Sequence, residues 1–391
     1  MNIVIINTLY FPYSIGGAEK SVKSLAENFT VMGNNVAVIT LAEEQSIATF
    51  NDVTIHRLRM ENTYFPFNGA VKTQKEKLIW HLKDVKNTKY NSYIKNFLIS
   101  FKTDILFTNN ISGFSVNVWQ IAKILNIKIV HTLRDYYLQC SKTTKFKNDK
   151  NCEKICLDCK ILSYYKKKCT VKIDYVIGTS NYILKDHLKN GFFNGVSNKV
   201  IYNGFDILPQ KKTAKQEAIK IVNFGFIGQI NKSKGIELLL KCFINLKSDD
   251  CKLLIAGKIS PGYLRYLQNE YKSKNITFLG YMESTFFFRK IDVLIVPSLW
   301  NEPFGRVVLE SLINEKPVLG SARGGIKELL KNNTPFVFEP AQRNLTELLE
   351  KIILEPNFLK EFIFDRKFIE DFKITQTAGQ YITIFNKLLN G

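Results

Sequence analysis

The sequence has no unbroken apolar run that approaches the ~18 residues needed for a membrane-spanning helix. Its N-terminal apolar stretch, residues 2–6, is short and turns polar at Asn7, so it predicts a first β-strand rather than a signal peptide. We therefore expect a cytoplasmic protein, whose seven cysteines are thiols, metal ligands or redox groups rather than a disulfide framework.

Common signatures of nucleotide and metal binding are also missing. The sequence contains neither the G-x-G-x-x-G fingerprint of dinucleotide binding nor the G-x-x-x-x-G-K-[ST] phosphate loop, which disfavours nicotinamide cofactors and nucleotide hydrolysis. The few histidines are scattered and indicate no metal site: His56, His81, His131 and His187.

Acidic residues are scarce relative to basic ones, and the formal net charge is +20. Residues 72–95 hold seven lysines against Glu76 and Asp84, and residues 142–168 hold nine lysines against three acidic residues. Such segments attract phosphate-rich surfaces such as anionic lipid, although a general abundance of lysine, isoleucine and asparagine explains them equally well. No nucleic-acid recognition motif accompanies the charge, so we expect no nucleic-acid partner.

Short β-branched runs alternate with helical stretches along nearly the whole sequence. Unbroken apolar runs such as residues 293–296 suit a parallel sheet covered on both faces, and the alternation indicates right-handed βαβ crossovers. With 391 residues the chain is too long for one ordinary core. The predicted fold class is α/β, with two Rossmann-like doubly wound domains facing across a cleft. The expected strands form two sets: 2–7, 35–41, 52–57, 104–108, 127–132, 174–178 and 198–202; then 220–226, 252–256, 276–279, 292–296, 317–320 and 335–338.

The domain boundaries follow from composition. We expect an N-terminal domain over 1–205, with a lysine- and cysteine-rich insertion at 140–169, and a C-terminal domain over 217–375. A polar stretch with Pro209 and several lysines predicts a linker at 206–216. Residues 376–391 have the pattern of an amphipathic helix.

The most informative motif follows strand 292–296. Pro303 and Gly305 break the chain, and a helix is expected from about Arg306, with its free amides and dipole favouring an anion such as phosphate. Glu302 precedes that helix and Glu310 lies about one turn inside it. A carboxylate can accept two hydrogen bonds from a vicinal diol such as that of ribose, but a capping and a solvated glutamate would show the same spacing.

Three other loops place glycine between a strand and a helix. Gly228 and Gly235 flank Lys234, which at a helix start can neutralise a diphosphate. Gly16-Gly17 and Gly324-Gly325 would let backbone approach a ligand closely, or would simply make tight turns.

The order of these motifs resembles that of the retaining glycosyltransferases of family 4, which have the GT-B fold. The matching features are Gly16-Gly17, Gly228…Lys234-Gly235, Glu302-x7-Glu310 and Gly324-Gly325…Glu328. Residues 202–206 are similar to the family's segment before the interdomain linker, and residues 131–140 to an acceptor-domain segment of one bacterial branch.

The resemblance implies that Glu310 holds the donor ribose, that Glu302 contacts the transferred sugar and diphosphate, and that Lys234 neutralises the diphosphate. It also implies that residues 280–282 line the nucleobase pocket and that the C-terminal helix crosses back to the N-terminal domain. The implied catalytic residues are Glu302, Lys234, Arg134 and Asp135. The implied donor-binding residues are Gly16, Gly17, Gly228, Gln229, Lys234, Met282, Glu302, Phe304, Gly305, Arg306, Val307 and Glu310. Similar enzymes need no metal or cofactor, and the donor would be a UDP- or GDP-sugar.

Three positions depart from the family's pattern. Gln229 stands where an arginine is frequent, Arg134 where a histidine is frequent, and no histidine follows strand 104–108. Arg134 stays protonated and cannot act as a base, so it either binds a sugar or phosphate or pairs with a structural carboxylate. Asp135 is either an acceptor contact or a helix cap.

Four cysteines gather in the insertion: Cys140, Cys152, Cys156 and Cys159. Their spacing is compatible with structural zinc, and three of them match the C-x3-C-x2-C spacing of an iron–sulfur cluster, for which no matching barrel pattern is present. Ordinary reduced thiols are the third alternative.

The sequence therefore predicts a retaining glycosyltransferase that transfers a sugar to a glycan or lipid-linked acceptor, in cell-surface polysaccharide or lipopolysaccharide synthesis. We expect it to lie peripherally on the inner face of the cell membrane, since its basic segments favour anionic lipid. The alternative is a nucleotide-sugar-binding subunit without turnover, because Gln229 and Arg134 depart from the family's pattern.

Overall fold

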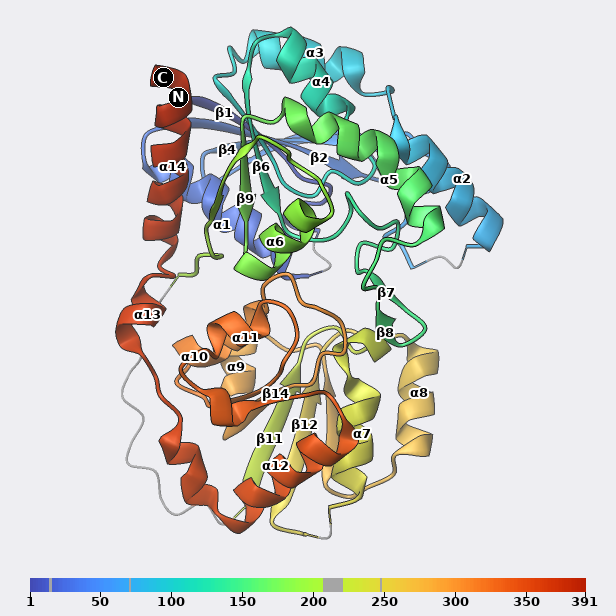
Figure 1. Cartoon of the computed structure of the whole chain (residues 1–391), viewed down its shortest axis with the longest axis vertical. Coiled ribbons are helices and arrows are strands. Elements are labelled where there is room, and N and C mark those ends of the chain that lie inside the picture. The colour runs from blue at the N-terminus through green and yellow to red at the C-terminus, as the bar shows by residue number, and fades with distance from the viewer. Residues whose placement is uncertain (14–15, 70–71, 207–220, 247) are drawn as a thin grey trace. The chain divides into compact units, whose positions relative to one another are not determined.

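A computed structural model describes residues 1–13, 16–69, 72–206, 221–246 and 248–391 (Figure 1). The chain divides into two compact units. Unit 1 comprises residues 1–145, 152–206 and 372–391, and unit 2 comprises residues 146–151 and 207–371. Of the predicted linker, 206–216, only Asp206 lies within the described residues. None of the described helices combines the length and the apolar content that a bilayer crossing requires.

Unit 1 is built on an eight-stranded sheet with the order β10-β9-β6-β5-β1-β2-β4-β3. All neighbouring strands are parallel except β3 and β4. The strands are β1 (Asn2–Ile6), β2 (Asn35–Ala42), β3 (Ser46–Phe50), β4 (Val53–Arg59), β5 (Ile105–Thr108), β6 (Lys128–Leu133), β9 (Tyr175–Gly178) and β10 (Ser197–Val200). The helices are α1 (Gly17–Val31), α2 (Gln74–Val85), α3 (Asn91–Ser100), α4 (Asn117–Ile124), α5 (Leu157–Cys169), α6 (Asn181–Lys189) and α14 (Ile374–Asn390).

The last helix, α14, is part of the core of unit 1. Tyr381 and Phe385 pack against Phe29 of α1 and Phe107 of β5, with ring centroids 5.2 to 6.1 Å apart. The Tyr381 hydroxyl lies 3.2 Å from Oγ1 of Thr132 on β6. Residues of α1 and α14, far apart in the sequence, therefore share one hydrophobic core cluster, in which aromatic side chains pack on aliphatic ones.

Unit 2 is built on a six-stranded parallel sheet with the order β13-β12-β11-β14-β15-β16. Its strands are β11 (Val222–Ile227), β12 (Cys251–Ala256), β13 (Ile276–Gly280), β14 (Val293–Val296), β15 (Val318–Ser321) and β16 (Val337–Phe338). Its helices are α7 (Ile236–Ile244), α8 (Pro261–Glu270), α9 (Ser284–Phe288), α10 (Arg306–Ile313), α11 (Ile326–Leu329), α12 (Gln342–Leu354) and α13 (Arg366–Glu370). Two parallel α/β sheets confirm the predicted fold class, and every expected strand is present to within two residues at either end.

Two hairpins were not predicted. Strand β3 pairs antiparallel with β4 through a turn at Asn51 and Asp52, whose φ angles are 48° and 59°. The second hairpin joins β7 (Phe146–Lys147) to β8 (Lys150–Asn151) and belongs to unit 2, although the sequence assigned its residues to the N-terminal domain. Contacts of Asn151 account for this placement: its side chain donates to the carbonyl of Leu299 at 2.7 Å and accepts from the amide of Asn301 at 2.9 Å.

Two buried histidines make the stability of unit 1 depend on pH. Burial lowers the pKa of His131 to about 3 and that of His187 to about 4, so both rings stay neutral in the folded protein far below the ordinary value of 6.5. The unfolded chain takes up these protons below about pH 6.5, so stability is complete above that pH and falls toward pH 4. Within that pH range, each histidine lowers the free energy of unfolding by about 1.4 kcal/mol for each unit by which the pH falls.

We therefore expect His131 and His187 together to lower the free energy of unfolding of unit 1 by about 3 kcal/mol between pH 7.5 and 5.5, in addition to the effects of His81 and Asp135 in the same unit. Urea unfolding followed by tryptophan fluorescence in a Trp300→Phe background would measure it, because Trp80 and Trp119 then report on unit 1 alone. In a His187→Gln variant, the part of the pH dependence of the unfolding free energy that comes from His131 and His187 should be about half as steep, whatever the absolute stability of the variant. An unchanged slope in that variant would contradict the assignment.

Candidate functional site

Glu302 is the centre of a polar cluster in the loop after β14. Only 6% of the residue is exposed, and its Oε1 accepts three hydrogen bonds. The donors are Nζ of Lys234 at 2.6 Å, Oγ of Ser298 at 2.7 Å and Nε1 of Trp300 at 2.9 Å. The structure thus brings together two residues that the sequence singled out separately, the lysine after β11 and the glutamate after β14.

Backbone contacts hold the two loops in this arrangement. The carbonyl of Ser233 accepts from the amides of Leu299 at 2.9 Å and Trp300 at 3.2 Å. Gly235 has a φ of 76°, and a Cβ atom there would lie 1.9 Å from the carbonyl oxygen of Pro297. Only glycine fits this position, because it needs both the left-handed conformation and the close approach.

Gly324 and Gly325 have the same kind of role. The amide of Gly325 donates to the carbonyl of Glu302 at 2.8 Å, and a Cβ atom on Gly324 would lie 2.1 Å from that carbonyl oxygen. The close approach that the structure shows at these glycines is to the loop that carries Glu302, whereas the sequence suggested an approach to a ligand.

The predicted helix after this loop is present as α10, which begins at Arg306 after Gly305 with a φ of 93°. Nε of Arg306 lies 3.0 Å from Oε1 of Glu310, one turn further on, and both side chains are largely buried. Phe304 is buried just before the helix, and Val307 lies in its first turn. A guanidinium and the amino-terminal end of a helix therefore lie in the same segment, an arrangement that favours a phosphate.

A row of glycines follows three neighbouring strands. Gly228, Gly257 and Gly280 lie at the carboxyl ends of β11, β12 and β13, with φ angles of 146°, 150° and 70°. A Cβ atom at Gly228 or Gly280 would meet nothing within 4 Å, so the backbone is open there. Sequence reasoning missed Gly257, whose Cβ would lie 1.7 Å from the carbonyl oxygen of Gly228.

Beside this row lie the half-buried Gln229 and Met282. Tyr281, within the segment 280–282 that the resemblance assigns to the nucleobase pocket, is 60% exposed and has Nζ of Lys258 at 5.5 Å from its ring centroid. An exposed aromatic ring beside open glycine backbone is suited to stack on a flat ring.

The remaining predicted site residues lie in unit 1. Gly16 and Gly17 begin α1, where the amide of Gly16 donates to Oε2 of Glu19 at 3.0 Å. Arg134, just after β6, donates through Nε to Oδ1 of Asn109 at 2.7 Å and through Nη1 to Oδ1 of Asn203. The predicted catalytic residues are therefore divided between the units, with Arg134 in unit 1 and the Lys234–Glu302 pair in unit 2.

Asp135 was expected to be either an acceptor contact or a helix cap. The helix-cap role is wrong, because Asp135 caps a turn. Its Oδ1 accepts from the amide of Tyr137 at 2.8 Å, and no helix follows at this point. Burial raises the pKa of Asp135 to about 6, the Glu19 carboxylate acts in the same direction, and the Tyr137 amide and Lys166 oppose the shift. A carboxyl that titrates near neutral pH is suited to exchange a proton with a sugar hydroxyl.

The four cysteines of the insertion are free thiols. A hydrogen bond from Cys159 and several backbone amides lower the pKa of Cys140 to about 6, while the same contact raises that of Cys159. Within the described parts of the chain, no group of three or more His, Cys, Asp or Glu side chains is arranged to hold a metal ion. The zinc and iron–sulfur hypotheses thus find no preformed ligand group.

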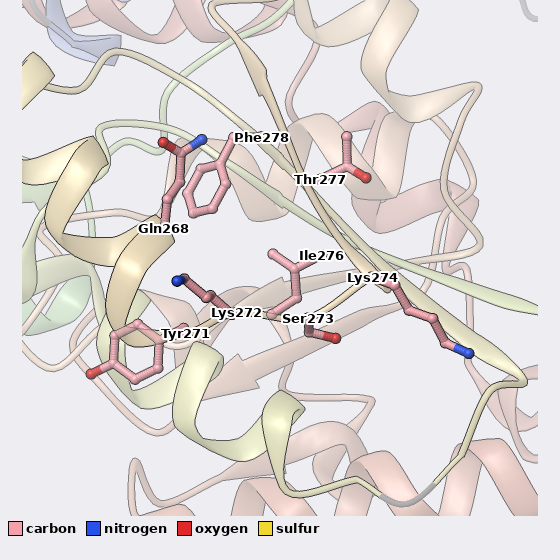
Figure 2. A pocket seen from close by; sticks show the side chains of 8 residues that line it. All are labelled: Gln268, Tyr271, Lys272, Ser273, Lys274, Ile276, Thr277 and Phe278. Atoms are coloured by element: carbon pink, nitrogen blue, oxygen red, sulfur yellow. The ribbon is translucent and has the colours of Figure 1, made fainter.

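Figure 2 shows an open hollow lined by residues of α8, β13 and the loop between them, including Gln268, Tyr271 and Phe278. The loop precedes β13, so the hollow lies toward the amino end of that strand. The glutamates and the glycine row follow the carboxyl ends of the strands, where ligands of open α/β sheets bind, and we assign no function to the hollow.

Comparison with known proteins gives a consistent result. Residues 15–207 match the family described as Glycosyltransferase Family 4, and residues 209–366 match Glycosyl transferases group 1. A 42.6 kDa protein in the cps region of Klebsiella pneumoniae is 34% identical over 333 residues, covering 84% of this chain and 87% of the relative.

Two further proteins extend this result. The capsular polysaccharide biosynthesis glycosyltransferase CapM of Staphylococcus aureus is 28% identical over 173 residues, covering 41% of this chain and 44% of CapM. The fold is similar to that of Anabaena HepE, solved in complex with UDP and glucose, with a TM-score of 0.71 and 16% identity. That similarity covers 98% of this chain and 99% of HepE.

A double-mutant cycle would test whether Lys234 and Glu302 are coupled. We expect Glu302→Gln and Lys234→Met to show a coupling energy of about 1 to 3 kcal/mol, because either change leaves a largely buried partner uncompensated. Urea unfolding of the two single variants and the double variant measures it.

The matched control is the pair Lys274 and Asp249, with Nζ and Oδ2 3.0 Å apart and both side chains 74% exposed. Lys274→Met and Asp249→Asn should couple by less than about 1 kcal/mol, since solvent screens the pair. Equal coupling in the two cycles would show that the Glu302 contact is no stronger than a surface ion pair.

Proposed function

The chain belongs to the family 4 glycosyltransferases, which have the GT-B fold, and on that premise we propose that it transfers a sugar from a UDP- or GDP-sugar to a glycan or lipid-linked acceptor with retention of configuration. The observation that carries the proposal is the cluster of Lys234, Ser298 and Trp300 around one oxygen of Glu302. It places a fixed cation beside a carboxylate at the carboxyl edge of a parallel sheet, where such sheets bind nucleotides.

The chemistry requires fixed positive charge. When the bond between the anomeric carbon and the diphosphate breaks, negative charge accumulates on the leaving group. Lys234, Arg306 and the positive end of the α10 dipole would meet that charge, so they would act mainly in the transition state. Charge from these groups makes a metal ion unnecessary for the departure of the diphosphate.

The other donor contacts follow from the same elements. Glu310 is oriented by Arg306 and would accept hydrogen bonds from the ribose hydroxyls. The glycine row and Tyr281 would receive the base, for which uracil is supported by the UDP bound to HepE. In a retaining reaction the acceptor oxygen bonds to the anomeric carbon on the face that the diphosphate leaves, and the acceptor proton passes to the departing phosphate.

Similarity to known proteins supports the proposed class of acceptor. CapM is named for capsular polysaccharide biosynthesis, which supports a role in making a cell-surface polysaccharide, with lipopolysaccharide as the related alternative. A lipid-linked acceptor would place a cytoplasmic enzyme peripherally on the inner face of the membrane.

A screen of donor hydrolysis tests the proposal. Purified protein is incubated without acceptor and with EDTA against UDP-, GDP- and ADP-sugars, and release of the nucleoside diphosphate is measured. We expect one UDP- or GDP-sugar to be hydrolysed slowly, and Glu310→Ala to lower that rate about a hundredfold, equivalent to roughly 3 kcal/mol in the barrier. Glu350→Ala, on the exposed side of α12, is the matched control and should leave the rate unchanged.

The alternative is a nucleotide-sugar-binding subunit without turnover, for which Gln229 and Arg134 are the motivating residues. Tight donor binding with no hydrolysis and no transfer to any glycan or lipid acceptor would favour it. Absence of binding to every donor would contradict both assignments.

A further inference from the structure

Two lysine-rich segments that are distant in the sequence form neighbouring helices. Helices α2 and α5 pack against one another and are seen side by side in Figure 1. A buried ion pair joins them, since Nζ of Lys166 on α5 lies 3.7 Å from Oδ2 of Asp84 on α2. Lys166 also donates to the carbonyl of Tyr137 at 3.3 Å, which fixes α5 to the segment after β6.

Each of the two helices carries a row of exposed apolar side chains. Leu78, Ile79 and Leu82 lie on one side of α2, with the inward Trp80 and Asp84 on another. On α5 the exposed positions are spaced by four and three residues, so they form one stripe along the helix. The six residues are 38% to 71% exposed: Leu78, Ile79, Leu82, Leu157, Ile161 and Tyr164.

Exposed lysines accompany both rows. Nζ of Lys168 lies 4.6 Å from the ring centroid of Tyr164, so charge and apolar surface are adjacent there. The exposed lysines of the two helices outnumber the acidic residues Glu76 and Asp158, since the buried Asp84 and Lys166 compensate each other. These lysines are Lys75, Lys77, Lys83, Lys160, Lys167 and Lys168.

We propose that these apolar rows and lysines, here named the α2–α5 surface, dock on an anionic lipid bilayer. Leucine and isoleucine side chains would enter the boundary between headgroups and acyl chains, tyrosine would lie at headgroup level, and lysines would contact lipid phosphates. This inference rests on the proposed function in one respect: a lipid-linked acceptor would be the reason for docking.

The charge of the surface selects this partner over two others. A second copy of the chain would bring lysines against lysines, which opposes pairing through this face. A nucleic acid would satisfy the lysines and leave six apolar side chains in water, whereas an anionic bilayer satisfies both.

Vesicle co-sedimentation tests the surface. The full chain is mixed with vesicles of phosphatidylcholine, alone or with phosphatidylglycerol, at low and high salt. We expect binding only to the anionic vesicles, weakened by salt. The double variant Leu82→Ser/Ile161→Ser should lose at least about tenfold in vesicle affinity, because it lacks two side chains that enter the bilayer. Lys160→Glu/Lys168→Glu should also weaken binding and reduce its salt dependence.

Two matched controls separate the surface from general effects. Ile124→Ser/Leu354→Ser changes exposed apolar residues elsewhere, and Lys241→Glu/Lys290→Glu makes the same charge change in unit 2. Neither should alter vesicle binding. Equal loss in the controls, equal binding to both kinds of vesicle, or no binding at all would overturn the proposal.

Two other results would also overturn it. Loss in the lysine variant alone would show that the apolar rows do not enter the bilayer. A dimer detected by light scattering and abolished by Leu82→Ser/Ile161→Ser would identify a second copy as the partner. Donor hydrolysis without acceptor should be unchanged in every variant, so failure of the enzyme assignment and failure of the docking assignment are distinguishable.

Discussion

One carboxylate oxygen holds together the loops at the carboxyl edge of the sheet in unit 2. Oε1 of Glu302 accepts from Lys234 on one loop and from Ser298 and Trp300 on the next, while its backbone carbonyl accepts from Gly325 on a third. A largely buried carboxylate is stable only when such partners compensate its charge. The lysine that would neutralise a diphosphate is therefore positioned before the donor arrives, and a bound diphosphate would share it with Glu302.

The regular part of the fold could be predicted because its strands are unbroken apolar runs. Val293–Val296 is fully buried, and a central parallel strand needs that pattern. Strand β3 and the β7–β8 hairpin lack it, since their residues are mostly exposed. Two Asn-Asp pairs could have indicated these hairpins, because asparagine and aspartate tolerate the positive φ of a hairpin turn. The pairs are Asn51-Asp52 and Asn148-Asp149.

The site could be predicted less completely than the fold. The order of the motifs singled out Lys234, Glu302 and Glu310, and the structure brings Lys234 and Glu302 together, but spacing does not show whether a glycine faces a ligand or another loop. Gly235 and Gly324 prove to be packed against protein backbone, whereas Gly228 is open. The two lysine-rich segments were recognised by charge alone, since the contact between Lys166 and Asp84 that brings them together is a tertiary one.

Because α14 completes the core of unit 1, the order of synthesis and the order of folding differ in this chain. The sheet of unit 1 begins at residue 2, but the core around Phe29 and Phe107 is completed by α14, through Tyr381 and Phe385 among others. All of unit 2 is synthesised in between. An N-terminal domain ordinarily folds first on the ribosome, whereas here the apolar face that α14 covers stays exposed until unit 2 and α14 have been synthesised. Exposed apolar surface makes a nascent chain prone to aggregation, which is the condition that chaperones counter.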